Sequence, residues 1–143
     1  MSCILTIGGA DFNIDDFIDK HDLNPYKKSY KGYPKFKSNP DGEKLVSSSF
    51  SIEVSLADFA DPENQLNDAI LFLTGNEEWL SDIPLTTKID YAILDFGFHI
   101  IYEHDFCKSI KIKNDLLLKA GNLGLEIQLS FYSIDIDDAL TVS

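Results

Sequence analysis

The chain has 143 residues, 44% of them hydrophobic and 12% aromatic, a composition that predicts one globular domain and excludes a mainly disordered protein. The chain has twelve lysines, no arginine and 24 acidic residues. The resulting net charge of −12 argues against binding to double-stranded nucleic acid or to an anionic membrane. No apolar run approaches the roughly 20 residues that span a bilayer, and residues 1–10 lack the basic start of a leader peptide. We therefore expect a cytoplasmic protein.

The first half of the sequence predicts a strand, a helix and a second strand. Residues 2–7 favour a strand, and Asn13 is placed to cap a helix whose apolar residues recur at helical spacing. Prolines and glycines interrupt residues 26–44, which predicts a long loop or an irregular hairpin. Residues 45–56 alternate between apolar and polar side chains. This pattern predicts a half-buried strand whose apolar positions from Phe50 to Leu56 share one face.

The second half predicts further helices and strands in alternation. Asp61-Pro62 is a strong helix start, and Gly75 is placed to close that helix. Gly97 separates two apolar runs, at 89–96 and 98–103, that form two strands or one kinked strand. The other expected elements are a helical turn at 76–83, a weak strand at 106–112, a helix at 114–120 and a strand at 123–132.

This order of elements predicts an α+β fold. We expect two layers, with two to three helices packed on one face of a mixed or antiparallel sheet. A single domain should cover residues 1–143, with an irregular basic loop at about 26–44 and a frayed acidic tail from about 133. Cys3 and Cys107 share no motif, so we expect each to be a small buried hydrophobic residue rather than half of a disulfide.

Catalytic and metal-binding patterns are weak throughout the sequence. The cluster of metal-ligand type contains His99, Glu103, His104 and Asp105. In a strand its two histidines would point to opposite faces, and on a helix they are five residues apart, whereas zinc-binding helices need four. The serines at 47–49 lack the glycines of a nucleophile elbow. We therefore predict no catalytic residue, no metal site and no cofactor.

Acidic residues gather between positions 53 and 105, which hold twelve acids and one lysine. This stretch contains Glu77-Glu78-Trp79, with the only tryptophan of the chain. Tryptophan is enriched at protein interfaces, and acids steer a basic partner towards it. One interpretation is therefore an interface for a basic protein formed by Glu77, Glu78, Trp79 and Asp82. The alternative is that Trp79 caps the core beside the preceding helix.

The segment from Tyr26 to Lys37 has the opposite character, with five lysines, four aromatic residues and no acid. Lysines could contact an anionic group while the aromatic rings stack on a base or another ring. The candidate ligand-binding residues are Lys27, Lys28, Tyr30, Lys31, Tyr33, Lys35 and Phe36. The alternative is that the loop packs on the acidic body and its lysines pair with nearby carboxylates.

Short motifs along nearly the whole chain resemble a family of small single-domain bacterial proteins classed as a domain of unknown function. These motifs are Asp11-Phe12, Leu23-x-Pro25, Lys31-Gly32, the strand from Phe50 to Val54, Phe72-Leu73, Leu94-Asp95-Phe96-Gly97, and Leu123-Gly124-Leu125 with Tyr132. The resemblance implies a small α+β fold in a bacterial cytosol and carries over no catalytic residue.

Two functions follow from these patterns as hypotheses. The first is a non-enzymatic protein-binding module, of the type of toxin-immunity proteins, that neutralises a basic partner through an acidic surface. The alternative is a small-ligand or nucleotide-binding domain that uses the loop at 26–37 as a lid. The sequence predicts no oligomeric state.

Overall fold

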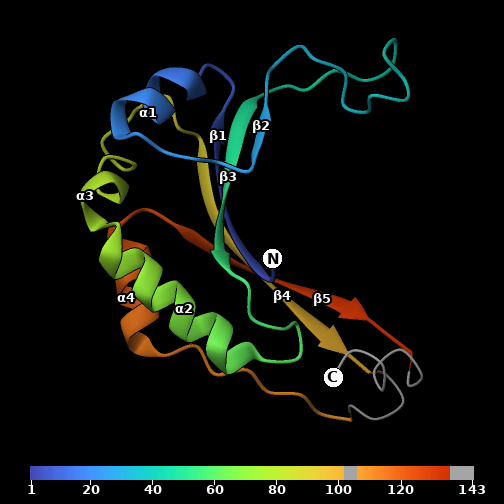
Figure 1. Ribbon diagram of the computed structural model, residues 1–143, viewed down its shortest axis with the longest axis vertical. Helices are drawn as coiled ribbons and strands as arrows, with labels where there is room; N and C mark the ends of the chain where they lie inside the picture. Colours follow the sequence, from blue (N-terminus) through green and yellow to red (C-terminus); the bar gives the residue numbers. More distant parts are fainter. Residues whose placement is uncertain (102–105, 136–143) are drawn as a thin grey trace.

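A single mixed sheet with its helices on one face organises the protein (Figure 1). The computed structural model describes residues 1–101 and 106–135. In these residues the chain forms β1 (Cys3–Gly9), α1 (Ile14–His21), β2 (Lys27–Ser29), β3 (Ser48–Ser55), α2 (Pro62–Gly75), α3 (Glu77–Leu80), β4 (Tyr91–Ile100), α4 (Asn114–Asn122) and β5 (Glu126–Ser133).

The strands lie in the order β2-β3-β1-β4-β5. Neighbours are antiparallel from β2 to β4, whereas β4 and β5 are parallel and are joined through α4. A parallel pair needs such a crossover, because a tight hairpin reverses the chain direction. The predicted α+β fold with a mixed sheet is confirmed. Over the described residues it carries four helices rather than two to three, because residues 77–80 form the separate short helix α3.

The core lies between the helices and one face of the sheet. On this face, the register of the three central strands aligns Leu5 with Ile52 and Leu94. Fully burying one large apolar side chain contributes roughly 1.5–3 kcal/mol. The buried side chains that meet in this layer include Cys3, Leu5, Ile7, Phe50, Ala92, Leu94, Phe96 and Phe98 of the sheet and Ile14, Phe17, Ile18, Leu66, Ala69, Leu73, Leu116 and Ala120 of the helices.

Side-chain caps start two of the helices at the predicted residues. The Asn13 carboxamide oxygen accepts a hydrogen bond from the Asp16 amide at 3.2 Å. The Asp61 carboxylate accepts one from the Asn64 amide at 3.2 Å, and a proline follows it in the first turn of α2. These acceptors satisfy amides that have no partner within the helix. Local sequence therefore sets where α1 and α2 begin.

The alternation of buried and exposed side chains predicted for residues 45–56 is seen in the first part of β3 but not at its end. Phe50 is buried on the helix side, but Ser55 is also buried and Leu56 is 73% exposed. The pairing of β1 with β3 shifts register between Cys3 and Ile4, which is the mark of a bulge. A bulge turns the following side chains to the other face. Ser55 therefore points to the helices, where its hydroxyl donates to Asp68 of α2 at 2.6 Å.

The described part of the two apolar runs around Gly97 forms one strand, β4, which is one of the two alternatives. Two other expectations change, and the first is the weak strand at 106–112, which does not form. Cys3 is buried as expected, and burial raises the pKa of its thiol, whereas Cys107 is exposed and the prediction for it was wrong. Residues 103–105 of the weak metal cluster, and the tail beyond Asp135, lie outside the described residues.

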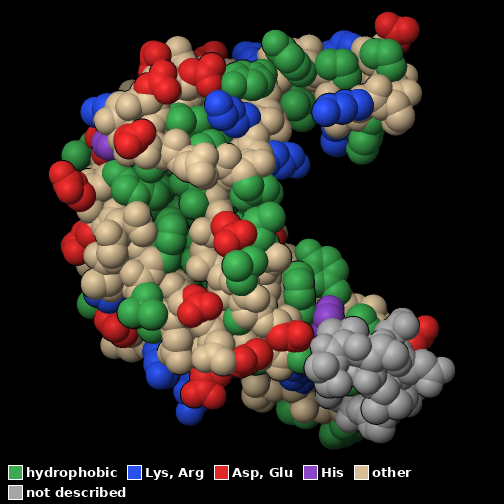
Figure 2. Space-filling model, viewed as in Figure 1, with side chains coloured by type: hydrophobic (Ala, Val, Ile, Leu, Met, Phe, Trp, Pro, Cys, Tyr) green, Lys and Arg blue, Asp and Glu red, His purple; other side chains and the backbone are tan. Residues whose placement is uncertain are grey.

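A long arm extends from β2 and β3 beyond the edge of the sheet (Figure 1). Backbone hydrogen bonds between residues 32–35 and 43–45 hold its two halves together, and Pro34 pairs with Lys44 as an isolated bridge. Figure 2 shows lysine and hydrophobic side chains on this arm, and a hollow below it on the side of the sheet away from the helices. In the described residues, no helix covers that face of the sheet.

Candidate functional site

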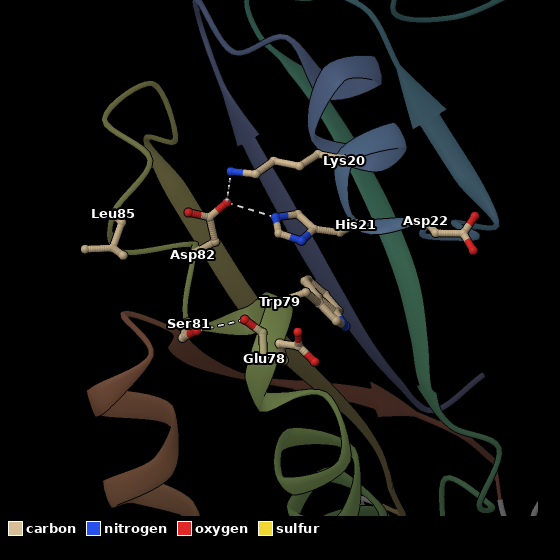
Figure 3. A pocket seen from close by; sticks show the side chains of 8 residues that line it. All are labelled: Lys20, His21, Asp22, Glu78, Trp79, Ser81, Asp82 and Leu85. Atoms are coloured by element: carbon tan, nitrogen blue, oxygen red, sulfur yellow. Dashed lines mark hydrogen bonds and ion pairs between the residues drawn. The ribbon is translucent and has the colours of Figure 1, made fainter.

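An open pocket of about 550 Å³ lies between the end of α1 and the segment that contains α3 (Figure 3). Its walls combine a tryptophan ring with three acidic and two basic side chains. The residues that line it are Lys20, His21, Asp22, Glu78, Trp79, Ser81, Asp82 and Leu85.

Asp82 connects the two sides of this pocket. One of its carboxylate oxygens accepts a hydrogen bond from the Lys20 ammonium at 3.0 Å and another from His21 Nε2 at 2.8 Å (Figure 3). The ring nitrogen must be the donor in the second contact, because an ionised carboxylate can only accept. The His21 hydrogen bond, followed by that from Lys20, lowers the pKa of Asp82 below its ordinary value. The carboxylate is therefore held in its charged form.

Trp79 is held rigidly at the edge of the same pocket. Its indole Nε1 donates to Asn76 Oδ1 at 3.0 Å, and its ring makes edge contacts with Phe17 and Phe72. The residue is partly buried and packs against the core. It packs on the core, as the second alternative expects, and it also forms a wall of the pocket, while the interface role stays a prediction.

A second pocket, of about 270 Å³, adjoins the first and shares Lys20 and Asp82 with it. It lies towards the start of α1, where Asp11 and Asp16 join its wall. The Lys20–Asp82 ion pair thus stands between two hollows that both carry acidic groups. The acidic surface is the set of carboxylates that line these two hollows, with Lys20, His21 and Lys88 among them: Asp11, Asp16, Asp22, Glu78 and Asp82.

Few of the carboxylates on this surface are neutralised by neighbours. Within the described residues, the carboxylates that form ion pairs are Asp11, Glu43 and Asp82. Asp22 and Glu78 of the larger pocket form no ion pair in that part of the chain. An unpaired carboxylate beside an aromatic ring is free to accept a cationic group from outside.

The four predicted interface residues do not all meet at one place. Glu78, Trp79 and Asp82 line the larger pocket, whereas Glu77 lines a separate hollow of about 190 Å³ together with residues of α4. Lys20 and His21 were missed as pocket residues. They lie 62 and 61 positions from Asp82 in the sequence, and no local pattern links them to it.

The seven candidate residues of the basic loop lie on β2 and the arm. Lys31 reaches Asp11 at 3.8 Å, and Tyr30 donates to Asp15 at 2.9 Å, a hydrogen bond that raises the pKa of the phenol. Lys35 pairs with Glu43 inside the arm at 3.7 Å. None of the seven lines either pocket beside α1 or the hollow at α4.

The outer part of the arm is strongly exposed. Tyr33 and Phe36 are 63% and 62% exposed. The expected packing of the loop on the acidic body is therefore limited to the contacts of Tyr30 and Lys31 with the region of α1. The lid hypothesis stays a prediction, and the outer part of the arm extends away from α1 and α3 (Figure 1).

The described residues contain neither a metal-binding cluster nor a membrane-spanning helix. In them, no group of three or more His, Cys, Asp or Glu side chains is placed to hold a metal ion. None of their helices is both long enough and apolar enough to cross a membrane. Comparisons with protein-family models, curated proteins and solved structures found no match. The family resemblance of the sequence therefore stays a prediction.

Proposed function

We propose that the protein is a non-enzymatic protein-binding module that uses the acidic surface between α1 and α3 to bind a basic protein. The observation that carries this proposal is the larger pocket, where the fixed ring of Trp79 lies near Glu78, whose carboxylate forms no ion pair among the described residues (Figure 3). A lysine or arginine side chain of a partner would lie over the ring and pair with Glu78, while Asp22, which points away from the ring, adds negative charge at the rim. The net charge of −12 would speed its approach.

The hydrogen bonds of the pocket favour binding over catalysis. Ser81 is the hydroxyl residue in its wall, and that hydroxyl donates to the Glu78 carbonyl at 2.8 Å. His21 donates to Asp82 through Nε2. A nucleophilic serine would instead need the histidine as a base within hydrogen-bond reach. The histidine–carboxylate pair therefore supports a structural role for these groups, which is to fix the wall of the pocket.

An immunity-type role is the more specific form of this proposal. A cationic nuclease binds the phosphates of its substrate through basic residues. An acidic surface that covers those residues would inhibit it by occupying the same positions. For such a partner, the measured quantity is the cleavage of nucleic acid by the nuclease with and without this protein.

Fluorescence of Trp79 gives a direct test, because this is the only tryptophan of the chain. We would titrate the protein at low salt with oligolysine and with a basic protein that contains no tryptophan. The expected result is a saturable change in emission that high salt abolishes. The absence of any change at low salt would contradict the proposal.

Two adjacent glutamates supply a matched pair of variants. Glu78→Gln removes a carboxylate from the larger pocket, and Glu77→Gln removes the same charge from a residue that lines a different hollow. We expect Glu78→Gln to weaken binding by about two- to fivefold, as for an exposed ion pair worth up to about 1 kcal/mol. Glu77→Gln should have a smaller effect. Equal effects would show a diffuse attraction rather than binding at the pocket.

A further inference from the structure

A small aromatic pocket lies on the face of the sheet that the helices leave uncovered. It has a volume of about 190 Å³, and the rings of Tyr26, Phe59 and Tyr132 are part of its wall. Asp95 supplies a carboxylate to the same wall, and Gly97 of β4 lies next to the rings of Phe59 and Tyr132. Figure 2 shows hydrophobic side chains in the hollow on this side of the molecule.

The rings of Phe59 and Tyr132 meet nearly at right angles. The planes of Phe59 and Tyr132 are 85° apart, and their centres are separated by 5.8 Å. Tyr26 and Tyr132 are 46% and 51% exposed, so much of their surface is open to a ligand. The exposed faces of these rings carry the negative side of their π systems, which attracts a cation.

Buried contacts hold the loop that carries Phe59 against β4. Gln65 is fully buried, and its side-chain amide donates to the carbonyls of Asp58 at 3.1 Å and of Gly97 at 2.9 Å. The His99 amide donates to the Phe59 carbonyl at 3.1 Å, and the His99 ring stacks on that of Phe59. The position of the ring is thus fixed before any ligand arrives, which lowers the entropic cost of binding.

Gly97 makes room for the two rings. A Cβ atom at this position would lie 2.5 Å from Phe59 and 3.2 Å from Tyr132. Any residue with a side chain would therefore push the Phe59 ring from its place. Glycine in the middle of a strand usually weakens that strand, but here it allows the rings to approach the backbone closely.

The chemistry of the wall indicates the charge of the ligand. The Asp95 carboxylate accepts a hydrogen bond from Ser130 at 2.7 Å and forms no ion pair among the described residues. Besides the rings, the wall contains Met1, Ile4 and Ser2, and the buried Ser2 hydroxyl has no hydrogen-bond partner among the described residues. Ring faces beside a carboxylate favour a cation that presents polarised methyl groups to the rings. A methylated ammonium is such a cation.

We infer that this pocket binds a methylated ammonium cation, with the three rings around the methyl groups and Asp95 balancing the charge. This inference does not depend on the proposed binding surface at α1 and α3, because the two sites share no residue. The ligand could be a free quaternary amine or a methylated lysine of a protein. Both present the same cationic head group.

The test is a titration followed by NMR and calorimetry. The probes are tetramethylammonium, choline, a peptide with trimethyl-lysine, and 3,3-dimethylbutanol as the neutral analogue of choline. We expect the cations to bind and the affinity of the neutral analogue to be at least about tenfold lower, because only a charged group is attracted by the ring faces and Asp95. Tighter binding of the peptide than of choline would assign the cation to a protein, and the reverse order would assign it to a free amine.

Matched variants decide whether binding occurs at this pocket. Asp95→Asn keeps the shape and removes the charge, and Tyr132→Leu removes one wall; each should weaken the binding of tetramethylammonium about tenfold. Tyr26→Leu is a second wall variant in case Tyr132→Leu unfolds. Tyr33→Leu, on the arm, and Glu78→Gln, in the other pocket, should leave binding unchanged. Equal binding of the neutral analogue, unchanged binding by Asp95→Asn, or no binding of any cation would overturn the inference.

Discussion

The two faces of the sheet come from the same strands but serve different purposes. On the covered face, large apolar side chains such as Leu94 and Phe96 are fully buried under the helices. On the other face, their neighbours Ile93 and Asp95 are half-buried, and the aromatic pocket lies there. Because side chains alternate along a strand, one residue can stabilise the fold while the next is free to bind.

We expect the largest change in the free energy of unfolding from one of two adjacent residues of β4 that face opposite sides of the sheet. Leu94→Ala removes a fully buried side chain from the core, and we expect it to lower the free energy of unfolding by about 2–5 kcal/mol. Ile93→Ala, on the uncovered face, should cost clearly less, because its side chain is already partly in water. Urea unfolding measures both. Equal losses would mean that the uncovered face is buried in solution, for example against a second copy.

We expect a smaller change in the free energy of unfolding from Gln65, whose buried amide joins the loop before α2 to β4. Gln65→Met keeps the length of the side chain but leaves the carbonyls of Asp58 and Gly97 without their donor. We expect a loss of about 1–3 kcal/mol in the free energy of unfolding, with weaker binding of tetramethylammonium. Asn122→Met, at an exposed position at the end of α4, is the control. Normal cation binding by Gln65→Met would show that the amide stabilises the fold without positioning Phe59.

Acid titration tests the contact that joins α1 to the segment after α3. The lowered pKa of Asp82 means that its charged form stabilises the folded state. This contribution is present at neutral pH and is lost as the pH falls from the ordinary value of 3.8 through the lower folded value. Asp82→Asn should therefore destabilise the protein at pH 7 but not in acid, where the carboxyl is protonated in both states. An equal destabilisation at both pH values would assign the effect to packing.

Local signals in the sequence predicted much of the fold but little of either pocket. Asn13 and Asp61 act within one helical turn, so their roles as caps were readable from a few residues. Adjacent helical residues point about 100° apart, so the divergence of Glu77 and Glu78 could also have been predicted. The contact of His21 with Asp82 could not, because it depends on how two distant segments pack.

The same reason explains the errors in the strands. The bulge at the end of β3 depends on its pairing with β1, and only that pairing shows that Ser55 turns inward. The aromatic pocket takes its rings from a segment before β2, a loop after β3 and the strand β5. Its residues are scattered in the sequence, and no spacing connects them. The sheet brings them together, so the site becomes visible only in the folded chain.

We expect the smallest change in the free energy of unfolding from substitutions on the arm, whose outer side chains are among the most exposed. Tyr33 and Phe36 are mostly exposed, so Tyr33→Ser and Phe36→Ser should change the free energy of unfolding by less than about 0.5 kcal/mol. A loss above about 1 kcal/mol would show that the arm packs on the acidic body in solution, as one alternative from the sequence expects. The same variants bear on the lid hypothesis. If a nucleotide stabilises the protein against heat, and these substitutions abolish that stabilisation, the arm closes over the ligand; unchanged stabilisation would place the ligand elsewhere.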